Sequence, residues 1–375
     1  MPAGSSPDAV KAVQRACRLL RAFEEGGEVQ RLRDLAAKTG MHKATASRLL
    51  RTLEREGLLE RAGAAGFRSR VRIPAGRPPR IGFATRGSDT PFSRAVTESV
   101  EHAAAEAGIE LTTVSSRRTP RTALRNVETL VRAAVKLVIE FQSHERLAPL
   151  IASRFLEAGI PVIAVEIPYP GATYFGANNY QAGLIGGRAL GRWIAAEWRG
   201  RLEHIVLLEE AAAGPLAKLR VEGMLAGVRE ILPRSETVRT TEIDGRGSLE
   251  KAFDAVRRQL RFQPPRLTAV LAGNDPMALG AIRAYEEAGR QRSCAVIGQN
   301  ATIEARSELR RKGTCLVASV AYFPERYGGE IIRLARTILA GKPAPPAVFT
   351  RHELITAANV DRVYPLDRVG FPSVS

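Results

Sequence analysis

Hydrophobic positions in the first 70 residues recur at helical spacing. Steps of three and four residues predict three helices, over residues 9–23, 32–39 and 42–56, and Gly57 is expected to end the third. An extended segment follows, turns through residues 63–66, which are glycine and alanine, and then returns. The N-terminal pattern therefore predicts three helices followed by a two-stranded hairpin.

From residue 80 onward, short apolar runs alternate with amphipathic stretches. The apolar runs predict strands at residues 81–85, 110–114, 136–140, 161–165, 204–208, near 238, 267–272 and 295–298. The amphipathic stretches predict helices at residues 91–108, 120–134, 144–158, 180–198, 216–232, 248–260 and 276–289. This alternation predicts an α/β fold of two doubly wound parallel-sheet lobes, with a ligand cleft at the carboxyl ends of the strands.

These two patterns predict two domains joined by a linker. The expected boundaries are residues 1–68 for the N-terminal domain, 69–80 for an Arg- and Pro-rich linker, and 81–375 for the C-terminal domain. Within the C-terminal domain, we expect lobe 1 to hold about 81–177 and 323–351, and lobe 2 about 178–322 and 352–375.

The distribution of charge indicates a polyanionic partner. The chain has 375 residues and a formal net charge of +17. Residues 1–80 contain 17 Lys and Arg against 8 Asp and Glu, a net charge of +9. More than half of the excess lies in this N-terminal part, as expected for a domain that binds nucleic acid. An arginine-rich composition throughout the chain is the alternative explanation.

The third predicted helix has the features of a DNA-reading helix. Its apolar stripe, Ala46, Leu49, Leu50 and Leu53, faces a core, and its other face carries residue types that reach phosphates and base edges. The predicted contacts with double-stranded operator DNA are His42, Lys43, Thr45, Ser47, Arg48, Arg51 and, on the returning strand, Arg68. The linker arginines could contact the DNA backbone, or they could be solvated charges of the linker.

The stretch AVQRACRLLRAFEEGGEVQRLRDLAAKTGMHKATASRLLRTLEREGLLER, residues 12–61, resembles the winged helix-turn-helix of the IclR family of bacterial regulators. Its wing departs from the family pattern because it is rich in Ala and Gly. The resemblance implies that the second helix braces the third in the major groove. A homodimer would then place two such helices on a near-palindromic operator.

A second resemblance covers residues 81 to about 360. The stretches that carry it are AGIPVIAVE, FGANNYQAGLIGGRALGRWI, LRVEGMLAGV, VLAGNDPMALGAIRAYEEAG and VIGQNATIEA. They resemble the type 1 periplasmic binding protein fold, in particular its ribose-binding branch, which LacI-type repressors also carry as their effector domain. The resemblance implies a small sugar or polyol effector bound between the two lobes.

The same resemblance implies a set of ligand contacts. The matching positions are Arg86, Thr90, Phe92, Ser93, Glu166, Arg220, Asn274, Asn300 and Tyr322. A buried Arg220 needs a partner, and we expect Glu166 to be that partner. Asn274 could instead cap a helix, and Tyr322 could belong to the core. Asn300, Tyr322 and Ile167 replace the Asp, Gln and Arg usual in the ribose-binding branch, so a less charged pocket and a ligand other than ribose are expected.

The sequence shows no catalytic or metal site. The five histidines, at positions 42, 102, 144, 204 and 352, lack metal-ligand spacing. No Gly-x-Ser-x-Gly, Walker or Rossmann motif is present, and the helical Gly186 and Gly187 are expected to serve close packing. We therefore expect a protein that is not an enzyme and that has no metal or other cofactor.

Cysteine usage and hydropathy predict a cytoplasmic protein. Cys17, Cys294 and Cys315 are odd in number and widely spaced, which argues against a disulfide framework. No signal peptide is visible, and no apolar run approaches the ~18 residues of a membrane span. We expect no membrane partner.

The sequence thus predicts a ligand-responsive transcriptional regulator, a homodimeric repressor of sugar or polyol catabolism or transport genes. Ligand would close the cleft and alter the spacing of the two DNA-reading heads, or act through oligomerisation if the linker is flexible. The alternative is a cytoplasmic sugar-binding sensory module without specific DNA binding.

Overall fold

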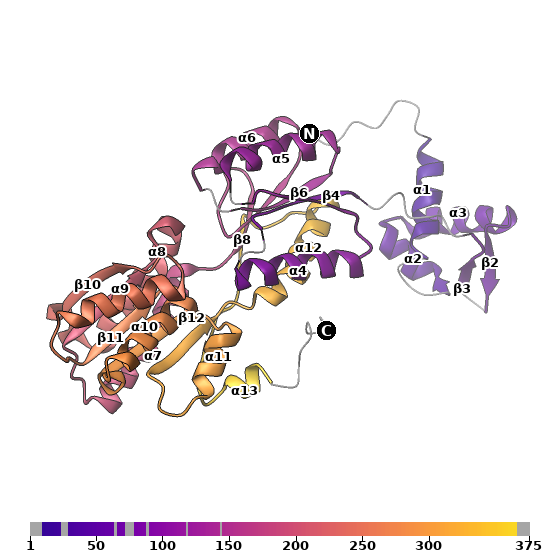
Figure 1. The fold of residues 1–375 in the computed structure, drawn as a ribbon. Helices are drawn as coiled ribbons and strands as arrows, with labels where there is room; N and C mark the ends of the chain where they lie inside the picture. The colour runs from indigo at the N-terminus through magenta and orange to yellow at the C-terminus, as the bar shows by residue number, and fades with distance from the viewer. Residues whose placement is uncertain are drawn as a thin grey trace. The chain divides into compact units, whose positions relative to one another are not determined.

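The computed structural model of the chain forms two compact units, Met1–Pro78 and Pro79–Ser375. It describes residues 10–23, 29–63, 66–71, 79–87, 90–117, 119–142 and 145–365 (Figure 1).

The N-terminal unit is a three-helix head with a small sheet. Its helices are α1 (Lys11–Arg21), α2 (Leu32–Thr39) and α3 (Lys43–Arg55), and its strands are β1 (Gln30–Arg31), β2 (Leu59–Ala62) and β3 (Gly66–Ser69). The sheet is antiparallel in the order β1-β3-β2. The predicted helices and hairpin are present, whereas β1 was not predicted, because two polar residues carry no periodic signal.

The head folds around a compact apolar core. Leu19, Leu35 and Leu50, one from each helix, are fully buried, and Phe67 of the hairpin packs with them. Gly40 ends α2 and Gly57 follows α3, both with left-handed backbone (φ 66° and 74°) that favours glycine. The glycines therefore set the turns that present α3 on the surface of the head.

Lobe 1 is a parallel sheet between two helical layers. The strand order is β14-β8-β7-β6-β4-β5. The strands are β4 (Ile81–Thr85), β5 (Leu111–Ser115), β6 (Leu137–Phe141), β7 (Val162–Val165), β8 (Thr173–Gly176) and β14 (Ala347–Phe349). The helices are α4 (Pro91–Glu106), α5 (Pro120–Arg132), α6 (Ala148–Glu157) and α12 (Tyr327–Leu339). Successive residues of β6 point to opposite cores, one with α4 and α12 and one with α5 and α6.

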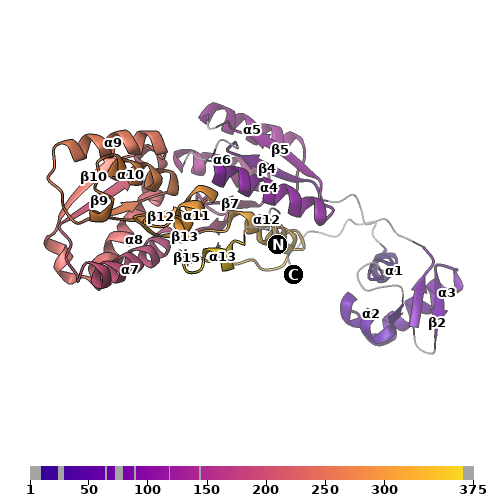
Figure 2. The same cartoon turned by 60° about the horizontal axis from the view of Figure 1, so that its bottom comes forward.

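Lobe 2 repeats this architecture (Figure 2). The strand order is β10-β9-β11-β12-β13-β15. The strands are β9 (His204–Glu209), β10 (Arg239–Asp244), β11 (Thr268–Ala272), β12 (Cys294–Asn300), β13 (Leu316–Ala321) and β15 (Glu353–Ile355). The helices are α7 (Asn179–Glu197), α8 (Pro215–Ile231), α9 (Leu249–Arg261), α10 (Asp275–Glu287), α11 (Ile303–Arg310) and α13 (Val360–Val363). Only the edge strand β15 runs antiparallel among the described strands of this sheet.

Close helix packing positions the polar residues of lobe 2. A Cβ at Gly183 would lie 2.1 Å from the Arg220 carbonyl oxygen, and one at Gly187 would lie 2.0 Å from that of Met224. These glycines let α7 approach α8 closely, as predicted for the glycine-rich helix. The beginning of α7 thereby lies beside Arg220 of α8.

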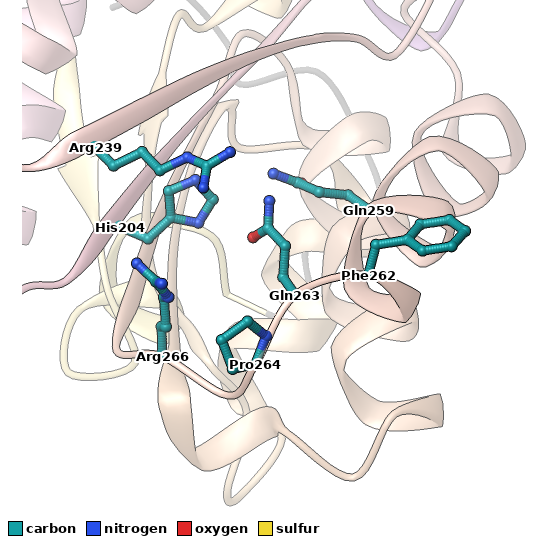
Figure 3. A pocket seen from close by; sticks show the side chains of 7 residues that line it. All are labelled: His204, Arg239, Gln259, Phe262, Gln263, Pro264 and Arg266. Carbon is teal, nitrogen blue, oxygen red and sulfur yellow. The ribbon is translucent and has the colours of Figure 1, made fainter.

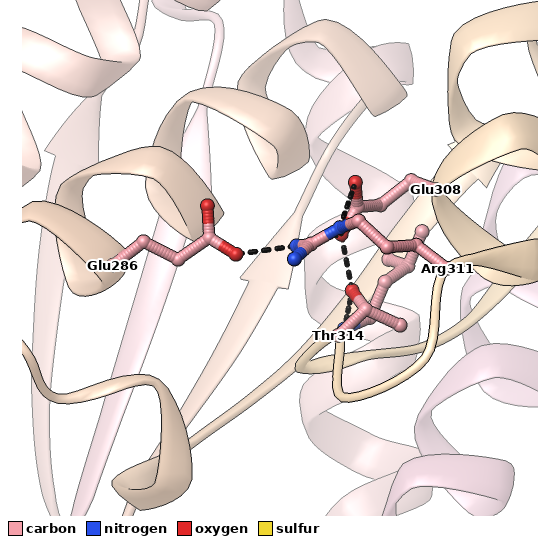
Figure 4. Close-up of polar contacts among 5 residues, drawn as sticks. Glu286, Glu308, Arg311 and Thr314 are labelled. Carbon is pink, nitrogen blue, oxygen red and sulfur yellow. Dashed lines mark hydrogen bonds and ion pairs between the residues drawn. The ribbon is translucent and has the colours of Figure 1, made fainter.

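A surface network links α10 and α11 at the other side of lobe 2. Arg311 directly follows α11, and its guanidinium donates to Glu286 of α10 (Figure 4). Its Nε also lies 3.1 Å from each carboxylate oxygen of Glu308. Thr314 donates to the same Glu308 carboxylate. The network holds the segment that follows α11 against α10.

The predicted two-lobed doubly wound fold is confirmed. The chain passes between the lobes after β8, after β13 and after β14, because the next element belongs to the other sheet or its helical layer. No helix in the described ranges is long and apolar enough to cross a membrane.

Candidate functional sites

Helix α3 separates its apolar and basic side chains cleanly. Ala46, Leu50 and Leu53 are buried in the head, whereas Lys43 and Arg48 are exposed. The separation follows from the period of the helix, which places residues three and four apart on one face. The basic side chains of this face are therefore open to solvent in the described part of the head.

The remaining predicted residues of α3 frame this face. His42 is the N-cap residue, and its Nδ1 accepts from the Ala44 N–H at 3.4 Å. Thr45 and Ser47 are half-buried, and exposed Arg51 donates to the Ser47 hydroxyl at 3.3 Å. The six predicted residues of this segment therefore lie on one helix and its cap.

The hairpin arginines are paired with a carboxylate. Arg70 donates to Glu60 at 2.9 Å, and Arg68 donates to the same carboxylate at 3.4 Å. The hydrogen bond from Arg70 is the main reason that the pKa of Glu60 lies below its usual value. Arg68 thus offers DNA less free charge than Arg48 does. Residues 64 and 65 of the predicted turn lie outside the described residues.

Arg220 of α8 is the centre of a polar cluster in lobe 2. Its Nε donates to Asn179 Oδ1 at 2.6 Å, and its Cζ lies 4.8 Å from the centre of the Tyr322 ring. A guanidinium over an aromatic face is held by the charge distribution of the ring. Asn179, not Glu166, is the hydrogen-bond partner of Arg220, and the Glu166 charge acts on Arg220 at longer range, where it helps to raise the pKa of the guanidinium.

Tyr322, which directly follows β13, is fully buried. Its hydroxyl donates to Gln299 Oε1 at 3.0 Å, and its ring lies 4.7 Å from the His352 ring, edge to face. Burial lowers the pKa of His352 to about 4, so this ring is neutral at neutral pH. Tyr322 therefore belongs to the core of lobe 2 and also contacts Arg220.

Glu166 follows β7 in lobe 1 with left-handed backbone, φ 66°. Its Oε1 accepts from the Tyr327 hydroxyl at 2.6 Å and from the Ala177 N–H at 3.2 Å. The Tyr327 ring lies edge to face with Phe92, 5.8 Å between centres. Glu166 is therefore held rigidly among aromatic rings of lobe 1 and a backbone amide of the connection to lobe 2.

Phe92 links the two groups of predicted residues. It packs against a buried cluster made of Ala177, Ala182, Val320 and Tyr322. It also contacts Tyr327, the partner of Glu166. The structure thus brings Phe92, Glu166, Arg220 and Tyr322 into one connected set that spans both lobes.

Three predicted residues have local structural contacts at helix starts. Thr90 Oγ1 accepts from the Ser93 N–H at 3.1 Å and caps α4. Asn274 Oδ1 accepts from the Met277 N–H at 2.9 Å and caps α10, which is the structural role weighed for it from the sequence. Asn274 Nδ2 also donates to the Gly247 carbonyl at 3.4 Å, and Thr90 Oγ1 lies 2.7 Å from the Ser93 hydroxyl, so a ligand would have to share or replace these contacts.

The last two predicted residues are Arg86 and Asn300. The Arg86 guanidinium lies 5.6 Å from the centre of the Phe141 ring. Asn300 ends β12 with φ 103°, and its Oδ1 is buried with no hydrogen-bond partner among the described residues. An unpartnered buried acceptor is costly unless a ligand or water satisfies it.

Four further polar residues were not predicted. Asn179, Gln299 and Tyr327 are the partners of Arg220, Tyr322 and Glu166. Glu140 is the only charged residue in the apolar run Leu137–Phe141, which is the signal that could have identified it. Burial raises its pKa to about 8, and its Oε2 has no hydrogen-bond partner in the part of the chain that the structure describes.

The described residues include no group of three or more His, Cys, Asp or Glu side chains that could hold a metal ion. The chemistry on offer consists of amides, a guanidinium, a carboxylate and aromatic faces. Groups of these kinds can donate to and accept from hydroxyls.

Residues 81–343 match the periplasmic binding protein domain, over more than half of the chain. The chain belongs to this family. Residues 12–63 match the IclR helix-turn-helix domain. An IclR-type head thus precedes the binding domain, and both resemblances are confirmed.

In sequence, the chain is similar to the ribose import binding protein of Salmonella typhimurium, with 24% identity over 257 residues that cover 68% of this chain and 82% of the relative. It is also similar to the ribose operon repressor of Escherichia coli, with 28% identity over 230 residues that cover 58% of this chain and 64% of the relative.

Solved structures share the fold of the C-terminal unit. A solute-binding protein from Mycobacterium smegmatis with bound glycerol has a TM-score of 0.67 at 23% identity, over 76% of this chain and 96% of the other. A solute-binding protein from Agrobacterium vitis with bound allitol has a TM-score of 0.67 at 18% identity, over 76% and 98%.

Proposed function

We propose that this chain is a sugar- or polyol-responsive repressor that binds operator DNA as a homodimer in the cytoplasm. The observation that carries the proposal is the presence, in one chain, of an IclR helix-turn-helix head with an exposed basic α3 and a two-lobed periplasmic binding protein domain. The ribose operon repressor among its relatives supports a regulatory role, and the ribose import binding protein and the polyol-bound structures support the ligand class.

The ligand is proposed to lie between the lobes, against Arg220, Phe92 and Tyr322. Guanidinium and amide groups would donate to hydroxyls, and an aromatic face would contact the C–H face of the ligand. Asn300 Oδ1 and Gln299 Nε2 are buried and have no hydrogen-bond partner among the residues that the structure describes, and a hydroxylated ligand would satisfy both. Arg86, Thr90, Ser93, Glu166 and Asn274 complete the proposed contacts.

On DNA, α3 is proposed to enter the major groove. Lys43, Arg48 and Arg51 would contact base edges or phosphates, with His42, Thr45 and Ser47 beside them and Arg68 at the backbone. In a dimer, two such helices would meet successive major grooves of a near-palindromic site. Ligand would change DNA occupancy by changing the dimer geometry or the oligomeric state.

The ligand half of the proposal is tested by thermal unfolding of the full chain with D-ribose, D-allose, allitol, glycerol and myo-inositol. A true ligand at 100 times its Kd adds about 2.7 kcal/mol to the free energy of unfolding. We expect one or more of these probes to raise the Tm saturably, and the Arg220→Ala variant to lose that response. A chain that responds to none of them would contradict the ligand class.

The DNA half is tested by gel shift on the promoter next to the chain's own gene, at moderate salt and with a non-promoter fragment as control. A specific band that weakens in the Arg48→Ala variant is expected. A chain that binds a sugar but gives no specific band would instead be a sensory module without DNA recognition.

A further inference from the structure

A hollow of about 280 Å³ lies at one end of lobe 2, lined by His204, Arg239, Gln259, Phe262, Gln263, Pro264 and Arg266 (Figure 3). His204 and Arg239 begin β9 and β10, and Arg266 precedes β11. The hollow is therefore at the amino ends of these parallel strands. The proposed sugar contacts Asn274, Asn300 and Tyr322 are at the carboxyl ends, so the hollow is a separate site.

The lining of this hollow is basic. Arg239 and Arg266 contribute two guanidinium groups, and no lining residue is acidic. Neither guanidinium has a hydrogen bond or an ion pair with the residues that the structure describes. Figure 3 shows both arginines, Gln259 and Gln263 pointing toward one space beside His204, whereas the Phe262 ring points away.

Gln259 is the second observation that points to a ligand. Both atoms of its carboxamide, Nε2 and Oε1, are buried and lack hydrogen-bond partners among the described residues. A buried amide without partners costs free energy that a bound ligand can recover. Gln259 lies in the last turn of α9, where its side chain joins the lining of the hollow.

His204 reports on the charge in this hollow. Its Nε2 lies 2.9 Å from Thr241 Oγ1 of β10. Burial, together with the positive charges of Arg239 and Arg266, lowers the pKa of His204 below its usual value. The ring is therefore neutral at neutral pH, and a bound anion that offset the two arginines would raise its pKa.

We propose that the hollow binds a small phosphate ester as a second ligand of this chain. The two planar guanidinium groups match the charge of a phosphate dianion and can each donate to a pair of its oxygens. The amides of Gln259 and Gln263 supply further polar partners. The volume lies near the lower limit of about 300 Å³ for ligand pockets, which favours a small metabolite.

Calorimetric titration of the full chain tests this proposal, with glycerol 3-phosphate, inorganic phosphate and glycerol as probes. Saturable binding of glycerol 3-phosphate, tighter than that of inorganic phosphate, is expected, because the hollow has room for more than the anion. Equal binding of phosphate and the ester would overturn the ester as the ligand. Equal binding of glycerol and the ester by the Arg220→Ala chain, in which the interlobe site is impaired, would overturn the phosphate site.

Variants assign the binding to the hollow. Arg239→Gln and Arg266→Gln should each weaken glycerol 3-phosphate binding about ten-fold or more, since each removes charge-assisted hydrogen bonds. Arg261→Gln is the matched control, because Arg261 is exposed at the end of α9 and does not line the hollow. Arg220→Ala tests the interlobe site and should leave this binding unchanged. Equal weakening by Arg261→Gln, or loss with Arg220→Ala, would contradict the assignment.

The His204 ring gives a readout that does not depend on the arginine variants being well folded. Its resonances, assigned by their absence in His204→Gln, should titrate with a higher pKa when glycerol 3-phosphate is bound. An unchanged pKa at saturating ester would show that the ester binds elsewhere. This test is independent of the proposed repressor function, because it measures neither DNA nor sugar binding.

Discussion

The two proposed recognition surfaces differ in how their polar groups are held. On α3, Lys43 and Arg48 are exposed and project from a helix whose other face alone is buried. Between the lobes, Arg220 is tied to Asn179, and the fully buried Tyr322 is tied to Gln299. The first surface carries its charge into solvent, whereas the second has a preformed network.

Because of this difference, a substitution on α3 should affect binding alone, whereas a substitution in the interlobe network should affect both binding and stability. A substitution on α3 removes a contact with DNA and leaves the core of the head intact. A substitution in the interlobe network removes a possible ligand contact and also leaves a neighbouring polar group without its partner. Stability measurements should therefore distinguish the two surfaces before any ligand is known.

The largest effect is expected for Arg220→Ala. Loss of the bond to Asn179 and of packing on Tyr322 should lower the free energy of unfolding by about 2 to 3 kcal/mol. Loss of a charged donor should weaken ligand binding about a hundred-fold. Urea unfolding and titration of the ligand found by thermal shift measure the two effects.

Arg192→Ala is the matched control, because Arg192 is an exposed arginine of α7, the helix that packs on α8. It should change neither stability nor affinity. If Arg220→Ala behaved like this control, the interlobe network would not be a binding surface.

Glu140→Gln should stabilise the chain in a pH-dependent way. Folding raises the pKa of Glu140 from 4.5 to about 8, so the folded chain keeps a proton that the unfolded chain releases between these values. The contribution of Glu140 to stability therefore falls as pH rises through this window. Relative to the parent, Glu140→Gln should gain about 3 kcal/mol at pH 8 and little at pH 5.

Unfolding at several pH values measures this gain, with exposed Glu157→Gln as the control in the same lobe. Burial also raises the pKa of Asp275, to about 7, and this gives the parent and both variants the same trend. The difference between the proteins therefore isolates Glu140. A constant difference from pH 5 to pH 8 would contradict the raised pKa.

Arg48→Ala should weaken operator binding by about 1 to 3 kcal/mol if this residue reads a base edge. Stability should not change, because Arg48 is exposed. Arg15→Ala, an exposed arginine of α1, is the control. Unchanged affinity in the Arg48 variant, measured by fluorescence anisotropy, would remove it from the DNA-reading face.

The smallest effect is expected for Arg68→Ala, because Glu60 already offsets its charge. Operator binding should weaken by less than about 1 kcal/mol, equally for all DNA sequences. Glu60→Gln should have the opposite sign, since it frees both Arg68 and Arg70. Anisotropy titrations at several salt concentrations measure both, and a Glu60→Gln variant that bound more weakly would contradict this arrangement.

The sequence predicts the parts of the fold that have a long periodic signal. Runs such as Leu137–Phe141 are apolar because both faces of a parallel sheet are covered, and they were assigned correctly. The short strands β8 and β14 were not predicted, since three or four residues cannot establish a period. The elements β13, β15, α11 and α12, which all follow residue 298, were not predicted either. Strands β8 and β14 pair with each other in parallel, and this long-range contact has no local signal in the sequence.

Contacts within the proposed ligand site were harder to predict. The expected Arg220–Glu166 pair follows from charge alone, but Tyr327 and Ala177 already satisfy one Glu166 oxygen. Asn179 reaches Arg220 because the glycines of α7 bring it close to α8, which depends on helix packing rather than on local sequence. The α3 face, by contrast, follows directly from the helical period.

We propose that occupancy of the interlobe site controls DNA binding by the head. DNase footprinting of the promoter with the full chain, with and without a saturating ligand from the thermal-shift series, tests it most directly. We expect ligand to change the protection by the parent chain and to leave the protection by Arg220→Ala unchanged. Identical protection with and without a ligand that demonstrably binds the parent chain would contradict it.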